Sequence, residues 1–134
     1  DGMTATLRYL DRDFTGLLFV NLVEFDMLWG HRRDSQGYAS ALREVDGWFA
    51  QVQRAMRPGD AIFFTGDHGV DPTYRGSDHT REMVPLLAYG EPLRAGVDLG
   101  TRSTFADLGQ TIAQAFGVGP LAAGTSFAAD LGLI

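Results

Sequence analysis

Three short, almost continuously apolar runs constrain the fold of this chain more than any other feature. They are LLFVNLV at 17–23, AIFFT at 61–65 and VPLLAY at 84–89. A strand with one solvated face alternates apolar and polar residues, whereas a strand buried on both faces is apolar throughout. Strands of the second kind are typical of parallel sheets. The runs therefore predict an α/β fold whose mostly parallel sheet is covered by helices on both faces.

The spacing of apolar residues predicts helices in the segments outside these runs. A stripe at steps of three and four predicts a long helix that Asp34 or Ser35 caps and Pro58-Gly59 ends. A second stripe predicts a helix with Ser103 as its cap and Gly117 as its stop, and 3–10 is expected to form a shorter helix. The stripes are Leu42, Val45, Phe49, Val52 and Met56, and then Phe105, Leu108, Ile112 and Phe116. We expect one domain spanning residues 1–134.

The composition excludes several kinds of chemistry. The chain has no lysine and no cysteine, so it forms no Schiff base, lysine-dependent phosphate loop, disulfide or thiolate metal site. A net charge of -6 disfavours nucleic acid and anionic membranes as partners, and no run approaches the roughly 20 apolar residues of a membrane span. The absence of cysteine fits a reducing, cytoplasmic compartment. Because the chain starts at Asp1 without a signal peptide, it is expected to be part of a longer soluble protein.

Every histidine of the chain lies close to an aspartate in a loop that follows an apolar run. The pairs are Asp26 and His31, Asp67 and His68, and Asp78 and His79. Ligands of open α/β sheets bind outside the carboxyl ends of the strands. Imidazole and carboxylate groups bind zinc, manganese or iron, and the number of such groups indicates two metal sites, or one site and a base. The third pair lies in the loop 69–83, which is long enough to indicate a functional role.

Blander interpretations of these residues stay open at this point. Surface loops collect aspartate and histidine by chance, and a Ser-His-Asp triad needs an exposed serine, although no serine of the chain lies in a G-x-S-x-G elbow. Arg32, Arg33 and Arg81 are candidates either for phosphate binding or for structural ion pairs. Glu24 either orients a ligand or is an ordinary exposed acid. The serines considered are Ser35, Ser40, Ser77, Ser103 and Ser126.

Several segments resemble the bacterial phosphopentomutases, a family of two-metal phosphoryl-transfer enzymes within the alkaline-phosphatase superfamily. They are FVNLVEFDMLWGHRRD at 19–34, TGDHGVDPT at 65–73, GSDHTREMVP at 76–85, LGTRSTFADLG at 99–109 and GTSF at 124–127. Asp-His-Gly marks the superfamily, whereas Gly-His-Arg-Arg and Asp-His-Thr-Arg-Glu favour the pentomutases. The resemblance implies an alkaline-phosphatase-like core, of which the chain is the C-terminal portion.

The resemblance also implies roles for five side chains. Asp26, His31 and His79 would bind one metal ion, usually manganese, with Mg²⁺ or Zn²⁺ as alternatives. Asp67 and His68 would bind the second ion. The family's other features match nothing in the chain: an aspartate near the N-terminus, the threonine that carries the phosphoryl group, and the inserted cap domain. No catalytic residue is therefore assigned within the chain.

The implied activity of the parent protein is the interconversion of ribose or deoxyribose 1-phosphate and 5-phosphate. We expect the isolated chain to be inactive, to hold one divalent ion tightly and a second weakly at most, and to self-associate through apolar surface that the missing segment would cover. The alternatives are a cofactor-independent phosphoglycerate mutase, a metal-dependent phosphatase, and a metal-binding module without catalytic activity.

Overall fold

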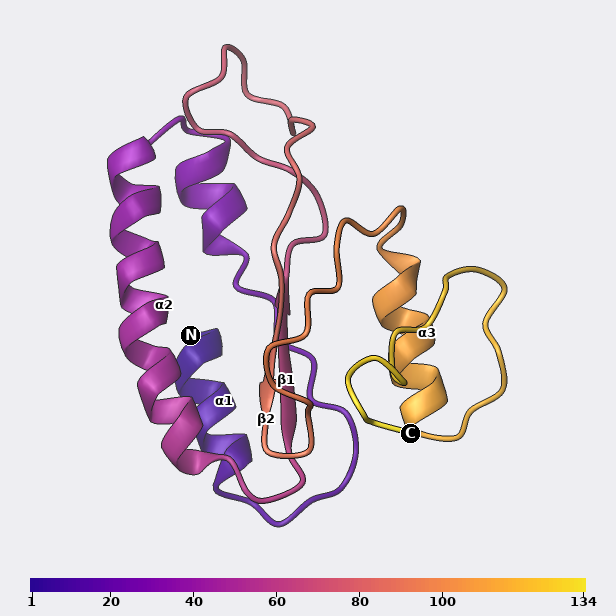
Figure 1. Ribbon diagram of the computed structural model, residues 1–134. Coiled ribbons are helices and arrows are strands. Elements are labelled where there is room, and N and C mark those ends of the chain that lie inside the picture. The colour runs from indigo at the N-terminus through magenta and orange to yellow at the C-terminus, as the bar shows by residue number, and fades with distance from the viewer. The chain divides into compact units, whose positions relative to one another are not determined.

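The structure is a computed structural model that describes residues 1–134 (Figure 1). The chain forms two compact units. The first unit comprises Asp1–Arg57 and His68–Pro85, and the second comprises Pro58–Asp67 and Leu86–Ile134. None of the helices combines the length and the apolar character that crossing a membrane requires. The expectation of one domain over residues 1–134 stays a prediction.

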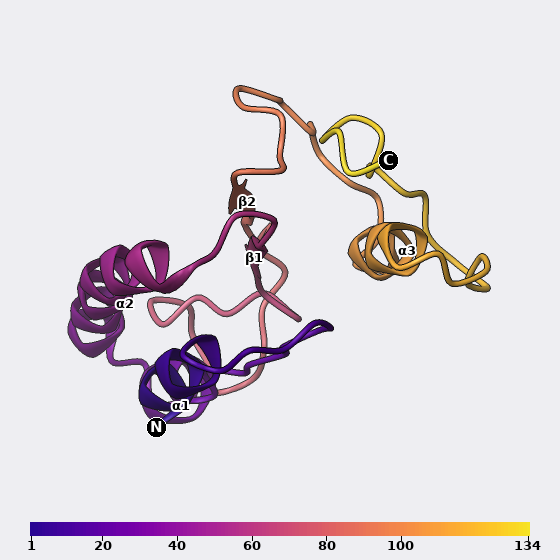
Figure 2. The same ribbon diagram turned by 90° about the horizontal axis from the view of Figure 1, so that it is seen from below.

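The first unit is helical. It contains α1 (Gly2–Leu10), η1 (Phe25–Gly30) and α2 (Ser35–Ala55), and α1 lies beside α2 (Figure 2). The Asp34 carboxylate accepts a hydrogen bond from the Gly37 amide at 2.8 Å, which satisfies an amide at the start of α2. This contact confirms the predicted cap, and the predicted helix at 3–10 is confirmed as well.

The buried face of α2 shares Val52 with the predicted stripe and otherwise differs from it. Ala41, Trp48 and Val52 are buried, whereas Leu42 is 53% exposed. The indole Nε1 of Trp48 donates a hydrogen bond to the Met3 carbonyl at 3.1 Å and thereby joins α2 to α1. The predicted stripe was therefore right for Val52 and wrong for Leu42.

The second unit contains the sheet, which has two strands. β1 (Ala61–Thr65) pairs antiparallel with β2 (Leu86–Gly90), with Ala61 opposite Gly90 and Thr65 opposite Leu86. Two predicted strands are thus confirmed, but the mostly parallel sheet with helices on both faces is not present. A parallel pair needs a crossover connection, usually through a helix, and the segment 66–85 between these strands contains none.

The predicted strand at 17–23 was wrong. These residues have no regular secondary structure, and Phe19 is 83% exposed. A strand exists only when its backbone pairs with a neighbour, and in the structure β1 and β2 pair with each other. The apolar character of the run is therefore not sufficient to make it a strand. Self-association through such exposed apolar surface stays a prediction.

Helix α3 (Ala106–Ala115) has the predicted end and a different start. Gly117 adopts a φ of 66°, and the Val118 amide donates to the Ala113 carbonyl at 2.9 Å, as in a Schellman motif. At the start, the Thr104 hydroxyl accepts a hydrogen bond from the Ala106 amide at 3.2 Å. The N-cap residue is Phe105, without a side-chain cap hydrogen bond, so the prediction of Ser103 as the cap was wrong.

The buried face of α3 is largely polar, and it holds the C-terminal tail. The Thr111 hydroxyl donates to the Asp107 carbonyl at 2.7 Å and accepts from the Phe127 amide at 3.0 Å. The Asp107 carboxylate accepts from the Thr125 amide and from Arg102 Nε, both at 2.8 Å. The tail is thus fixed by side chains that a search for apolar residues overlooks.

The Asp107 contacts predict that acid destabilises the second unit. The pKa of Asp107 is lowered, chiefly by the hydrogen bond from the Thr125 amide and also by Arg102, against the raising effect of burial. A carboxyl group whose folded pKa is lowered stabilises the fold above its unfolded pKa of about 3.9, and this contribution is lost as the pH falls through the folded pKa. We expect Asp107→Asn to lower the melting temperature at pH 7 and to have progressively less effect below about pH 4.

Thermal melts of both proteins between neutral and acidic pH test this expectation. Asp130→Asn is the matched control, because this carboxylate is exposed in the same unit. A difference between wild type and Asp107→Asn that stays constant down to the lowest pH would contradict the assignment.

Candidate metal centre

Helix η1 brings the first two predicted ligands together. It is a π-helix in which the His31 amide donates to the Asp26 carbonyl, five residues earlier, at 2.9 Å. In an α-helix, residues five apart lie about 140° apart around the axis and face different sides. The wider π turn instead places the two side chains on one side, where His31 Nε2 lies 3.2 Å from Asp26 Oδ2.

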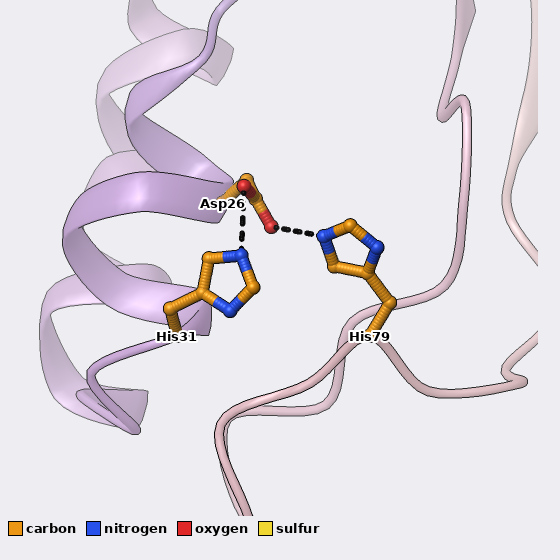
Figure 3. A group of neighbouring side chains, drawn as sticks. All are labelled: Asp26, His31 and His79. Carbon is orange, nitrogen blue, oxygen red and sulfur yellow. Dashed lines mark ion pairs between the residues drawn. The ribbon is translucent and has the colours of Figure 1, made fainter.

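The third ligand comes from the long loop 69–83, which has no helix or strand of its own. His79 Nε2 lies 3.2 Å from the other carboxylate oxygen, Asp26 Oδ1. Figure 3 shows both imidazole rings directed at this carboxylate, one from the helix and one from the loop. One ligand atom from each of the three residues lies within 4.8 Å of the others.

The hydrogen bonding of His31 determines which of its nitrogens faces the carboxylate. Its Nδ1 contacts the Ser77 carbonyl oxygen, and since a carbonyl only accepts, Nδ1 carries the proton. In the neutral ring, the lone pair of Nε2 then faces a carboxylate oxygen. Two acceptors at that distance repel each other unless a cation, either a second ring proton or a metal ion, lies with them.

The environment of Asp26 also fits a bound cation. Its Oδ1 atom is buried and accepts no hydrogen bond. Leaving a buried carboxylate oxygen unsatisfied is costly, and coordination of a metal ion removes that cost. One carboxylate and two imidazole groups suit a divalent transition metal, and the partial exposure of all three side chains leaves room for a further ligand. The residues therefore fit a metal site.

His68 lies beside this group. Its ring stacks on that of His79, with 3.7 Å between the centroids, and its Nε2 is 4.0 Å from Asp26 Oδ1. Its Nδ1 bonds the Gly69 carbonyl at 3.2 Å, and its Nε2 is the nitrogen on the side of Asp26. Four of the five predicted ligands thus come together in the first unit. Asp67 belongs to the second unit and stays a predicted ligand.

Two functional groups of the centre were missed by sequence reasoning. The carbonyl oxygens of Ser77 and Gly69 each bond the Nδ1 of a histidine. Because every residue has a carbonyl group, nothing in the sequence indicates a role for that of Ser77. The Asp-His-Gly motif is the one signal that points to Gly69. Ser77 contacts His31 through its carbonyl rather than its hydroxyl, so this contact does not favour a Ser-His-Asp triad.

Comparison with known proteins agrees with this chemistry. The chain is similar to proteins named phosphopentomutase from Herpetosiphon aurantiacus (53% identity over 96% of this chain and 33% of the relative), Anaeromyxobacter sp. (54%, 98% and 33%) and Clostridium novyi (48%, 98% and 34%). The chain thus spans about a third of the length of these curated relatives. The family model described as Metalloenzyme superfamily matches residues 1–120. With most of its length matched, the chain belongs to the metalloenzyme superfamily.

Proposed function

We propose that this chain is the metal-binding portion of a phosphopentomutase, an enzyme that interconverts ribose or deoxyribose 1-phosphate and 5-phosphate. The observation that carries the proposal is the group of Asp26, His31 and His79, in which two imidazole nitrogens face one carboxylate. The name shared by the similar proteins favours this activity over phosphoglycerate mutation or phosphatase activity. A cytoplasmic location is part of the proposal.

The proposed ligands divide between two metal ions. Asp26, His31 and His79 would hold one Mn²⁺, and Asp67 and His68 would contribute to the site of the second. A pair of divalent cations stabilises the attacking and leaving oxygens of an in-line phosphoryl transfer. The part played by this chain is to hold the carboxylate and the imidazole groups in place, with Ser77 and Gly69 fixing the tautomers of two histidines.

The two sites differ in the number of ligands that this chain offers. Three side chains serve the first ion and two serve the second, and no threonine here is assigned to carry the phosphoryl group. We therefore propose that the chain alone is inactive and that the activity belongs to the longer protein.

Metal titration of the chain tests the ligand count. After removal of metal with a chelator and dialysis, addition of Mn²⁺ should give one tightly bound ion per chain, and any second ion should bind much more weakly because fewer side chains hold it. The electron paramagnetic resonance signal of free Mn²⁺ measures the bound fraction. Two tight ions, or no binding, would contradict the proposed division. An assay of the full-length protein with ribose 1-phosphate and with phosphoglycerate separates the mutase activities.

A further inference from the structure

A small polar junction connects the two arms of the loop 69–83. The Gly69 carbonyl accepts a hydrogen bond from the Thr80 amide at 3.1 Å, in an isolated antiparallel bridge. The Thr80 hydroxyl accepts from the Asp71 amide at 2.8 Å and donates to the Glu82 carboxylate. The Thr80 hydroxyl thus acts both as a donor and as an acceptor. We call the contacts among Gly69, Asp71, Thr80 and Glu82 the Thr80 junction.

The Thr80 junction is adjacent in sequence to two of the predicted metal ligands. Gly69 follows His68, and Thr80 follows His79. The bridge between the two residues places the two imidazole rings face to face, with 3.7 Å between their centroids. The Gly69 carbonyl also bonds His68 Nδ1, so one oxygen atom helps to orient both arms.

The close approach of the arms depends on glycine at position 69. A Cβ atom there would lie 2.7 Å from the Glu82 amide nitrogen and 2.8 Å from the Thr80 carbonyl oxygen. Real Cβ atoms do not approach backbone this closely, and backbone atoms cannot rotate away as a long side chain does. The arms are therefore packed against each other at the junction, while most of the loop between them is exposed.

We propose that Thr80 is a positioning residue for the metal centre and that its hydroxyl holds the backbone that carries His79. The inference rests on the proposed function, because it concerns the affinity of the proposed metal site. A loop without regular structure loses conformational entropy when a bound ion fixes one of its residues. By ordering the residue next to His79 beforehand, the hydroxyl reduces the entropy that metal binding must lose.

Thr80→Val tests the inference because valine has nearly the shape of threonine and lacks only the hydroxyl. We expect this variant of the 134-residue chain to bind Mn²⁺ about 10-fold more weakly, within the range typical for loss of a group that orients a ligand. Thr80→Ser, which restores a hydroxyl, should recover most of the affinity. Thr73→Val is the matched control: its hydroxyl bonds the Asp71 carboxylate, whereas the Thr80 hydroxyl bonds the Asp71 amide.

The visible absorption of the Co²⁺-loaded chain adds a readout that depends on ligand geometry. It should change in Thr80→Val and stay as in wild type in Thr73→Val. If Thr80→Val does not fold, Glu82→Ala removes the partner carboxylate at an exposed position, and Glu82→Gln keeps an acceptor there. Glu82→Ala should weaken Mn²⁺ binding and Glu82→Gln should not.

The outcomes separate the inference from the proposed function. Failure of the wild-type chain to bind Mn²⁺ overturns the metal centre and the role of Thr80 together. Binding by wild type with equal affinity in Thr80→Val overturns the role of Thr80 alone. Equal weakening in Thr80→Val and Thr73→Val also overturns it, because any disturbance of the loop would then have the same effect.

Discussion

Replacing Asp26 with asparagine is expected to weaken Mn²⁺ binding by more than about 100-fold, beyond the usual effect of losing a group that only orients a ligand. Asp26 supplies the one carboxylate of the three-ligand group, and both histidines direct an Nε2 atom at it. Asparagine has nearly the same shape, so the change removes charge and coordinating strength while leaving the packing of η1 in place. Titration with Mn²⁺, followed through the signal of the free ion, measures the loss.

In the metal-free chain, the same substitution is expected to leave the stability of the fold unchanged or to raise it. Without a cation, the buried Asp26 Oδ1 accepts no hydrogen bond, which costs free energy in the folded state. We expect the melting temperature of metal-free Asp26→Asn to equal or exceed that of wild type, and the increase that Mn²⁺ gives to wild type to be absent. Asp46→Asn, an equal charge change at an exposed position of α2, is the control. Wild-type affinity in Asp26→Asn would refute its role as a ligand.

Truncation of Phe127 to alanine is expected to give the largest loss of stability, about 3–5 kcal/mol, as for other fully buried phenylalanines. The side chain has no exposed surface, its ring centroid lies 6.4 Å from that of Phe63, and the Arg102 guanidinium lies 5.3 Å from the ring centroid. Loss of the ring leaves a cavity beneath the tail that Thr111 anchors. Urea unfolding measures the change through circular dichroism, to which α3 contributes, while the fluorescence of Trp29 and Trp48 follows the first unit.

Phe116→Ala is the matched control because it removes the same ring from the same unit. Phe116 is 51% exposed, so its truncation should cost far less. Similar losses in the two variants would show that α3 packs through its apolar stripe after all. Transitions that differ between the two spectroscopic signals would indicate that the two units unfold separately, and each would then be fitted by itself.

The start of α2 and the end of α3 were predictable from the sequence, whereas the start of α3 and the buried faces of both helices were less so. Asp34 caps α2 and Gly117 ends α3 because these effects involve only neighbouring residues. The inner face of α3 depends on hydrogen bonds to a tail far along the chain, which place Asp107 and Thr111 inside and leave Phe116 exposed. A stripe of apolar residues cannot represent contacts of that kind.

The prediction that the strands run parallel was wrong for a related reason. Apolar runs located the strands at 61–65 and near 84–89 correctly, but the burial of both faces that they predicted was wrong, since Leu87 is 60% and Tyr89 46% exposed. Whether two strands run parallel depends on the connection between them, and whether a run such as 17–23 becomes a strand depends on a partner. Neither property is contained in the run itself.

The candidate site was more accessible to sequence reasoning than the fold around it. Asp26, His31, His68 and His79 were expected to come together, and the structure brings them together. Metal chemistry is carried by few residue types, so a chain with three histidines offers few alternatives. The carbonyl groups of Ser77 and Gly69 had no comparable signal because the backbone is the same at every residue.

The π turn of η1 sets a spacing rule for ligand pairs of this kind. On an α-helix, residues four apart lie about 40° from each other around the axis, so two ligands for one ion are sought at i and i+4. Asp26 and His31 are five residues apart, and His31 Nε2 still lies 3.2 Å from Asp26 Oδ2 because the turn between them is π-helical. A motif search restricted to the α-helical period passes over such a pair. A search that also allows ligands at i and i+5 includes pairs such as Asp26 and His31.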